Sequence, residues 1–206
     1  MSTKTDETIG HRDADTDHDI HELFRRRWSP RAFTEESLSR RELQSILEAG
    51  RWSASCNNDQ PWYFLVARRD EPERFQEMLG CINPSNQLWA GKAGALVVAV
   101  ARLTFTRDGQ ENPVALYDLG QAAAHMALQA TALGLQAHPM RGFDRAKARQ
   151  VYGVPDGYDV VTAIAIGTVG DPESLPDNLR QRELAPRQRR KLAEFVFSGK
   201  WGKPAF

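Results

Sequence analysis

The chain has few cysteines, no long hydrophobic run and no excess of charge of either sign. Among its 206 residues only Cys56 and Cys81 are cysteines, too few for a disulfide framework and too isolated for a zinc site. No apolar stretch approaches the roughly 18 residues of a membrane span, and the acidic N-terminus lacks the apolar core of a secretion signal. Lysine plus arginine (27) balances aspartate plus glutamate (27), so the charge favours neither nucleic acid nor an acidic membrane as a partner. We expect a cytoplasmic protein with reduced thiols.

Common nucleotide and metal motifs are also missing. The chain contains no G-x-G-x-x-G after a strand, no Walker loop and no H-E-x-x-H, which argues against a nicotinamide held on a Rossmann fold. Residues 1–18 alternate Asp with polar residues and cannot bury enough apolar area to fold. Their His and Asp spacing matches no closed tetrahedral metal site. The sequence therefore predicts a disordered tail over residues 1–18, one domain over residues 19–206, and no metal.

Short strands separated by helices are predicted for the rest of the chain. Helices are expected from about Ile20, after a capping box at Ser39, from Pro72, from Pro113 and after Asp144. Strands are expected at residues 63–67, 95–100 and 160–169, with a strand or turn at 135–142; the 95–100 run reads as a central strand buried on both faces. Residues 83–86 are expected to break a helix, residues 102–112 to form a polar loop, and the prolines from Pro172 onward to mark an extended arm.

The helix expected between Pro113 and Gly134 carries alanine at many contact positions. Small side chains allow close helix packing, either against the sheet or at the centre of a dimer, and the sequence alone does not separate the two. His125 lies inside this helix, where we interpret it as a core or interface histidine because nothing titratable flanks it.

Two polar stretches are candidate ligand sites. The first, which we call the elbow (residues 53–62), is a loop of small and amide residues that leaves a helix and is pinned by Pro61 before a strand. It reads either as a ligand-facing loop or as an ordinary helix–strand connection. The second, the basic segment (residues 27–31), is extended because Pro30 disfavours helix at Ser29.

Alternate residues of an extended chain point the same way, so Arg27, Ser29 and Arg31 offer two guanidiniums and a hydroxyl to a phosphate or another anion. The alternative is a solvated basic strand edge. The C-terminal basic pair, Arg187 and Arg189, repeats this spacing, and a glycine turn (residues 139–143) permits close approach of backbone to a ligand. The candidate site thus has four parts far apart in sequence: the elbow, the basic segment, the C-terminal basic pair and the glycine turn. Such a scattered set suits a large phosphorylated cofactor better than a simple inorganic anion.

These stretches resemble the motifs of the nitroreductase family of FMN-dependent oxidoreductases. The segment R-W-S-P-R-A-F from Arg27 resembles the family's R-x-S-x-[RK]-x-F opening, and S-C-N-N-D-Q-P-W from Ser55 resembles its more specific P-S-x-x-N-x-Q-P-W motif. Asn86, the glycine turn and the C-terminal basic pair follow in the family's order, so the likeness spans about residue 20 to the C-terminus.

The resemblance implies an α+β fold: a three-layer α/β/α sandwich with a mostly antiparallel sheet, in a homodimer that exchanges extended C-terminal arms and binds two FMN molecules at its interface. It implies that Arg27, Ser29, Arg187 and Arg189 hold the FMN phosphate and ribityl chain, and that Arg31 and Asn86 meet the pyrimidine end. Gly142, or the N–H of Arg141, would face flavin N5, with the elbow supplied by the other subunit. The implied cofactor-binding residues are Arg27, Trp28, Ser29, Arg31, Ala54, Ser55, Cys56, Asn58, Asn86, Met140, Arg141, Gly142, Arg187 and Arg189.

Four positions depart from the family pattern. Ala54 replaces a proline, Cys56 a serine, Trp89 a basic residue and Arg141 an acidic one. The pyrimidine end thus loses one cation and the active-site rim gains another, which affects the expected reduction potential and substrate choice. No His or Lys adjoins Cys56 to lower its pKa, so we interpret Cys56 as a small packing residue and not a nucleophile.

The implied activity is hydride transfer from NAD(P)H to flavin N5 and then to a nitroaromatic, quinone or similar small-molecule electron acceptor, both in one cleft by a ping-pong scheme. No side-chain nucleophile is needed. Two alternatives stay open: a flavin-binding storage or redox-sensing module without turnover, and other flavin chemistry such as flavin fragmentation or dehalogenation on the same fold. Phe105 and Tyr117, in and near the polar loop, are candidates for stacking on a substrate ring.

Overall fold

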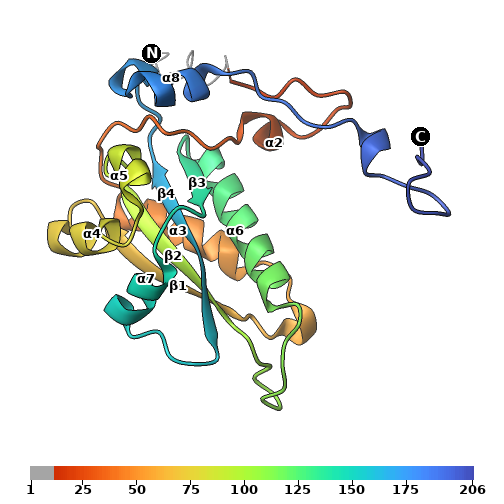
Figure 1. Ribbon diagram of the computed structural model, residues 1–206, viewed down its shortest axis with the longest axis horizontal. Coiled ribbons are helices and arrows are strands. Elements are labelled where there is room, and N and C mark those ends of the chain that lie inside the picture. Colours follow the sequence, from red (N-terminus) through yellow and green to blue (C-terminus); the bar gives the residue numbers. More distant parts are fainter. Residues whose placement is uncertain (1–11) are drawn as a thin grey trace.

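The computed structural model describes residues 12–206 and contains one four-stranded antiparallel sheet (Figure 1). The strands are β1 (Trp62–Arg68), β2 (Ala95–Arg102), β3 (Gln136–Met140) and β4 (Tyr158–Gly167). Their order across the sheet is β1-β2-β4-β3, and every neighbouring pair is antiparallel. This confirms the predicted antiparallel sheet, and it makes β1 and β3 opposite edges.

Helices cover both faces of the sheet. They are α2 (Glu22–Arg26), α3 (Arg40–Arg51), α4 (Pro72–Leu79), α5 (Pro84–Ala90), α6 (Ala115–Ala132), α7 (Arg145–Tyr152) and α8 (Asp177–Leu184), with short 3₁₀ turns η1 (Cys56–Asn58), η2 (Pro172–Ser174) and η3 (Leu192–Glu194). Ile46 of α3 and Met126 of α6 pack with Val97 of β2 on one face, whereas Trp89 of α5 packs with Leu96 on the other. Within residues 12–206, no helix combines the length and apolarity that crossing a membrane requires. The cytoplasmic location stays a prediction.

Strand β2 is the centre of the core. Residues from Ala95 to Ala101 are all buried, with Leu96 and Val98 in one hydrophobic cluster and Val97 in the other. A continuous apolar run is what a strand covered on both faces requires. The predicted central strand is therefore confirmed.

Local signals in the sequence set the ends of several helices. The Ser39 hydroxyl accepts the Glu42 N–H, and the Glu42 carboxylate accepts the Ser39 N–H at 2.8 Å, which is the expected capping box. The Asp144 carboxylate caps α7 by accepting the Lys147 N–H at 2.9 Å. Gly134, just after α6, has φ +77°, a left-handed value that glycine adopts at little cost.

Two helices occur where the prolines were read as breaks or extended chain. Pro84 opens α5 instead of only ending the preceding helix, and α8 follows Pro176 within the predicted arm. The physical reason is that the first turn of a helix tolerates proline, since its N–H would be unpaired there in any case. Both expectations were wrong at these points. Outside η3, the chain beyond Ala185 has no further helix.

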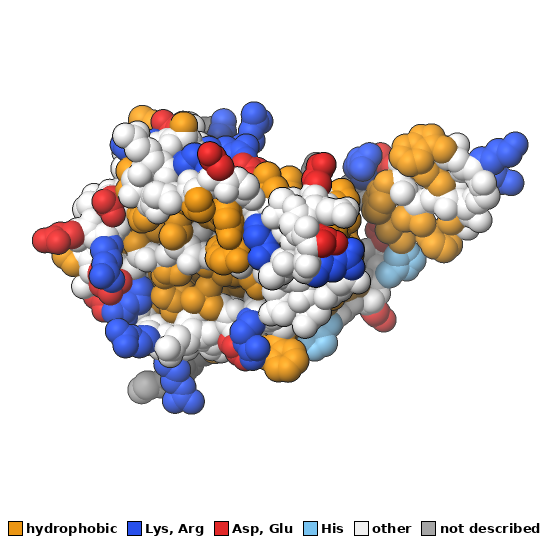
Figure 2. All heavy atoms as spheres, turned by 90° about the horizontal axis from the view of Figure 1, so that it is seen from below, with side chains coloured by type: hydrophobic (Ala, Val, Ile, Leu, Met, Phe, Trp, Pro, Cys, Tyr) orange, Lys and Arg blue, Asp and Glu red, His pale blue; other side chains and the backbone are white. Residues whose placement is uncertain are grey.

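The C-terminal arm, residues 185–206, projects away from the sheet and its helices (Figure 1). Near its end Phe197 pairs with Pro204, and the Phe197 ring lies 5.2 Å from the Trp201 ring. Trp201 is 94% exposed and Phe206 84% exposed. The view from below shows hydrophobic side chains on this arm, at the right of the molecule (Figure 2). The arm therefore presents aromatic surface that this chain alone leaves uncovered.

Candidate functional site

Strand β3 holds the basic segment in place. Gln136, only 1% exposed, accepts the Trp28 N–H at 3.1 Å and donates its amide to the Arg26 carbonyl at 3.2 Å. His138 donates its Nδ1–H to the Pro30 carbonyl at 2.7 Å. Residues two apart on a strand face the same side, so β3 fixes the backbone of the basic segment at two points. Neither Gln136 nor His138 was assigned a site role from the sequence.

A buried carboxylate from α8 fixes the other end of the basic segment. Glu183, 1% exposed, accepts the Arg31 N–H at 2.8 Å and the Ala32 N–H at 3.1 Å. Its carboxylate also lies 3.7 Å from the Arg31 guanidinium. This contact was not predicted, because the residues of α8 were expected to form extended chain.

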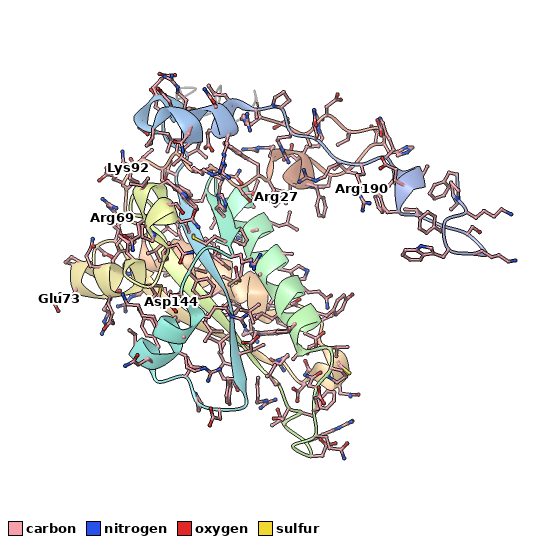
Figure 3. All side chains as sticks on the ribbon, in the orientation of Figure 1. Arg27, Arg69, Glu73, Lys92, Asp144 and Arg190 are labelled. Atoms are coloured by element: carbon pink, nitrogen blue, oxygen red, sulfur yellow. The ribbon has the colours of Figure 1, made fainter. Side chains whose placement is uncertain are left out.

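The basic segment and the C-terminal basic pair come together in space. Arg27, Ser29, Arg31, Arg187 and Arg189 line one groove of about 280 Å³. Figure 3 shows Arg27 beside α2, near the C-terminal segment. Burial, and then the charge of Arg189, lowers the pKa of Arg27; burial, and then the charge of Arg27, lowers the pKa of Arg187. Guanidiniums crowded in this way favour an anion that neutralises them.

Arg187 has a structural role within this groove. Its Nη1 donates to the carbonyls of Arg12 and Arg25, each at 2.7 Å, and its Nη2 donates to the carbonyl of Arg27 at 2.8 Å. The side chain therefore ties three stretches of backbone together while its positive charge stays in the groove. Its direct contact with a phosphate stays a prediction.

Asn86 and the glycine turn also lie together. The Gly142 carbonyl accepts the Asn86 side-chain amide at 3.1 Å and the Asn83 N–H at 3.0 Å. A Cβ atom at Gly142 would lie 2.3 Å from Asn86 Nδ2, so only glycine fits without displacing Asn86. Trp89 Nε1 donates to Asn86 Oδ1 at 3.2 Å, and the Trp89 ring, 1% exposed, lies 4.4 Å from the His138 ring. Trp89 is thus a core residue that holds Asn86 in position.

Strand β3 connects these two groups of residues. The arginine groove lies beside its first residues, and the glycine turn begins in its last two residues, Pro139 and Met140, and continues to Phe143. Four residue steps of a strand span roughly 13 Å. Met140 is buried and Arg141 is exposed. Because the arginine groove and the glycine turn lie at the two ends of this span, a ligand that uses both must be elongated, with an anionic end in the groove.

The elbow lies at the opposite edge of the sheet. It leads into β1, whereas the groove lies beside β3 and the glycine turn begins in β3. The three strand spacings between β1 and β3 amount to roughly 14 Å. Cys56 N–H donates to the Asp118 carboxylate at 3.0 Å, and Asn57 and Asn58 have φ of +52° and +56°. Its predicted site residues are half-buried Ser55 and the exposed Ala54, Cys56 and Asn58. Within one chain the structure does not bring the elbow to the arginine groove.

His138 makes the stability of the protein depend on pH. Burial, the largest effect, lowers its pKa from 6.5 to about 4, with the Pro30 hydrogen bond opposing and the Arg31 charge adding to the shift. The unfolded chain takes up a proton below about pH 6.5, but the native imidazole stays neutral until about pH 4. The free energy of unfolding is therefore not reduced by His138 above pH 6.5. As the pH drops toward 4, protonation of this histidine in the unfolded chain lowers the free energy of unfolding by about 3 kcal/mol.

We expect His138→Asn, which keeps a donor but does not titrate, to lose this part of the pH dependence. Urea unfolding of both proteins between pH 4 and 8 measures it, since the difference between the two curves cancels the other titrating groups. Parallel curves for the two proteins would contradict a neutral, buried His138.

The fold and the site define a mixed α/β protein with an arginine-rich groove at one edge of an antiparallel sheet. The model of the nitroreductase family matches residues 24–168. The chain belongs to the nitroreductase family.

Known proteins agree with this assignment. A crystal structure described as an oxidoreductase containing FMN superposes with a TM-score of 0.87 at 34% identity, covering 92% of this chain and 96% of that one. An uncharacterised 15.4 kDa protein of Mycolicibacterium smegmatis is 32% identical over 151 residues, covering 68% of this chain and 98% of that protein. The major NAD(P)H-flavin oxidoreductase of Aliivibrio fischeri is 31% identical over 90 residues, 43% of this chain and 41% of that enzyme.

Proposed function

We propose that this protein is an FMN-dependent oxidoreductase that takes electrons from NADH or NADPH and passes them to a nitroaromatic, quinone or similar electrophilic acceptor. The observation that carries the proposal is the placement of an arginine groove and a glycine turn at the two ends of β3. Family membership and the FMN-containing and NAD(P)H-oxidising relatives support it.

The residues present fit the phosphate end of FMN. Arg27 and Arg189 supply charge-assisted donors, and Ser29 lines the same groove. Trp28, 6% exposed, also lines it, and its Nε1 is buried without an acceptor in residues 12–206. Buried donors in proteins are normally hydrogen-bonded, so this N–H favours a ligand that supplies an acceptor. When bound, FMN supplies hydride transfer between a nicotinamide and an acceptor.

The chain's own residues bind and orient the flavin in this proposal. Arg31 and Asn86 serve the pyrimidine end, where a guanidinium favours the reduced, anionic form. Asn86 and Trp89 hold the glycine turn in one conformation, so that the backbone N–H of Gly142 or Arg141 is presented to the ring. The protein supplies positioning and charge and no side-chain nucleophile.

We further propose a homodimer in which the C-terminal arms are exchanged and the elbow of one chain covers the flavin of the other. Helix α6 buries Leu119 and Met126 against the sheet, yet Leu116 and Tyr117 on it are 50% and 68% exposed. Apolar surface of this kind on one helix favours pairing with a second copy. The projecting aromatic arm and the distance of the elbow from the groove also call for a second chain.

Anaerobic stopped-flow mixing of FMN-loaded protein with NADH and with NADPH tests the activity. We expect the visible absorption of oxidised flavin to disappear with at least one nicotinamide and to return when a quinone or nitroaromatic is added. A storage or sensing module would leave the flavin oxidised in the first mixing step. Product analysis after anaerobic and aerobic turnover separates acceptor reduction from flavin fragmentation and from dehalogenation.

A further inference from the structure

Residues 12–19, which we call the N-terminal strap, pack against the arginine groove. Ala14 N–H donates to the Arg25 carbonyl at 2.9 Å, and the Asp17 carboxylate accepts the Lys191 ammonium at 2.8 Å. Arg187, as described above, donates to the Arg12 carbonyl at 2.7 Å. The strap is thus held at three points by residues of α2 and of the C-terminal arm.

The side chain of Arg12 is placed in the groove by this strap. Its guanidinium lies 4.6 Å from the Trp28 ring centre, and Arg12 lines the same groove as Arg27 and Arg189. Its Nε is buried and has no hydrogen-bond partner in the part of the chain that the structure describes. Stacking on an aromatic face leaves the edge of a guanidinium, which carries its donors, free to bind an anion.

The charges around Arg12 leave the groove positive. Glu183 is the carboxylate that raises the pKa of Arg12 against the larger effect of burial, but it already accepts two backbone N–H groups of the basic segment. Asp13 lies 3.7 Å from Arg25, on α2. The Nη groups of Arg187 are occupied by carbonyls. Arg12 therefore offers hydrogen-bond donors to an anion, whereas the Nη donors of Arg187 already bind backbone carbonyls.

We propose that Arg12 is a further ligand of the phosphate monoester in this groove, held there by the strap and by Arg187. The inference rests on the proposed function, in which that phosphate is the one of FMN. Three guanidiniums, of Arg12, Arg27 and Arg189, then share the dianion, and Arg187 acts as a positioning residue through the Arg12 carbonyl. This role was not predicted, because residues 1–18 were interpreted as a disordered tail; residues 1–11 of that tail lie outside the described residues.

Equilibrium titration with FMN and with riboflavin, which lacks the phosphate, tests the proposal. We expect Arg12→Gln to weaken FMN binding about 10- to 100-fold, the range for loss of one charge-assisted hydrogen bond, and to leave riboflavin binding within about 2-fold. Arg12→Lys keeps the charge but not the paired donors, and we expect an intermediate loss for FMN. Arg74→Gln, an exposed arginine on α4, is the matched control and should change neither affinity.

The outcomes distinguish failure of FMN binding as a whole from failure of Arg12 as a phosphate ligand. If the unchanged protein binds neither flavin, the proposed function fails. If it binds FMN but Arg12→Gln changes neither affinity, or weakens FMN and riboflavin equally, Arg12 only packs on Trp28 and the inference is overturned. If Arg12→Gln does not fold, Arg12→Lys decides: loss for FMN alone supports a phosphate ligand, and equal or no loss overturns it.

Discussion

Replacing Arg27 and Arg189 together by glutamine is expected to weaken FMN binding at least about 100-fold. Each guanidinium would lose a charge-assisted hydrogen bond worth about 1.5–3 kcal/mol, and two such losses correspond to a factor of about 100 or more. The effect is large because both side chains face one groove and because burial, with the charge of Arg189, already lowers the pKa of Arg27. Fluorescence titration with FMN measures it.

The same double variant should be no less stable than the unchanged protein without flavin. Without flavin, the two guanidiniums repel each other and destabilise the fold. Removing both charges should therefore leave the urea midpoint unchanged or raise it. A double variant of two exposed arginines elsewhere, Arg40→Gln with Arg74→Gln, controls for the loss of net charge. Unchanged FMN affinity together with a lower midpoint would show that Arg27 and Arg189 serve the fold and not a ligand.

Replacing Glu183 by alanine is expected to destabilise the protein by about 3–5 kcal/mol. The substitution leaves the buried N–H of Ala32 and the N–H of Arg31 without their acceptor and removes a buried anion from beside the arginine groove. Breaking a buried charged pair from one side costs this much because the remaining groups stay desolvated. Glu183→Gln keeps one acceptor oxygen and should cost less, about 1–2 kcal/mol.

Urea unfolding at neutral pH measures this loss. Glu73→Ala on α4 is the matched control, since Glu73 is exposed on the far side of the molecule from the C-terminal arm (Figure 3), and it should stay within about 0.5 kcal/mol of the unchanged protein. If Glu183→Ala unfolds at the same urea concentration as Glu73→Ala, the buried carboxylate does not hold the basic segment.

Features that depend on neighbouring residues along the chain were predictable from the sequence. The capping box at Ser39, the buried run in β2 and the cap of α7 by Asp144 follow from residues within a few positions. Helices α5 and α8 were missed because Pro84 and Pro176 were read as breaks, although proline fits the start of a helix as well as a turn. In these cases the same residue type fits two local structures, and tertiary packing decides.

The site could be predicted only in part for a similar reason. The motifs named its arginines, Asn86 and Gly142, and the structure brings these together beside β3. The residues that hold them were not visible, because Gln136 acts on Trp28 across 108 sequence positions and Glu183 on Arg31 across 152. Contacts at such separations leave no local pattern. The elbow was predicted as part of the same site, but within one chain it lies at the β1 edge of the sheet, opposite β3.

The central claim is that residues of β3's edge in one chain and the elbow of a second chain hold one FMN. Titration of the purified protein with FMN, followed by light scattering on the saturated sample, tests it most directly. The account predicts saturation at one FMN per chain in a particle of two chains. A protein that does not take up FMN, or a single chain that binds it at full affinity, would contradict the account.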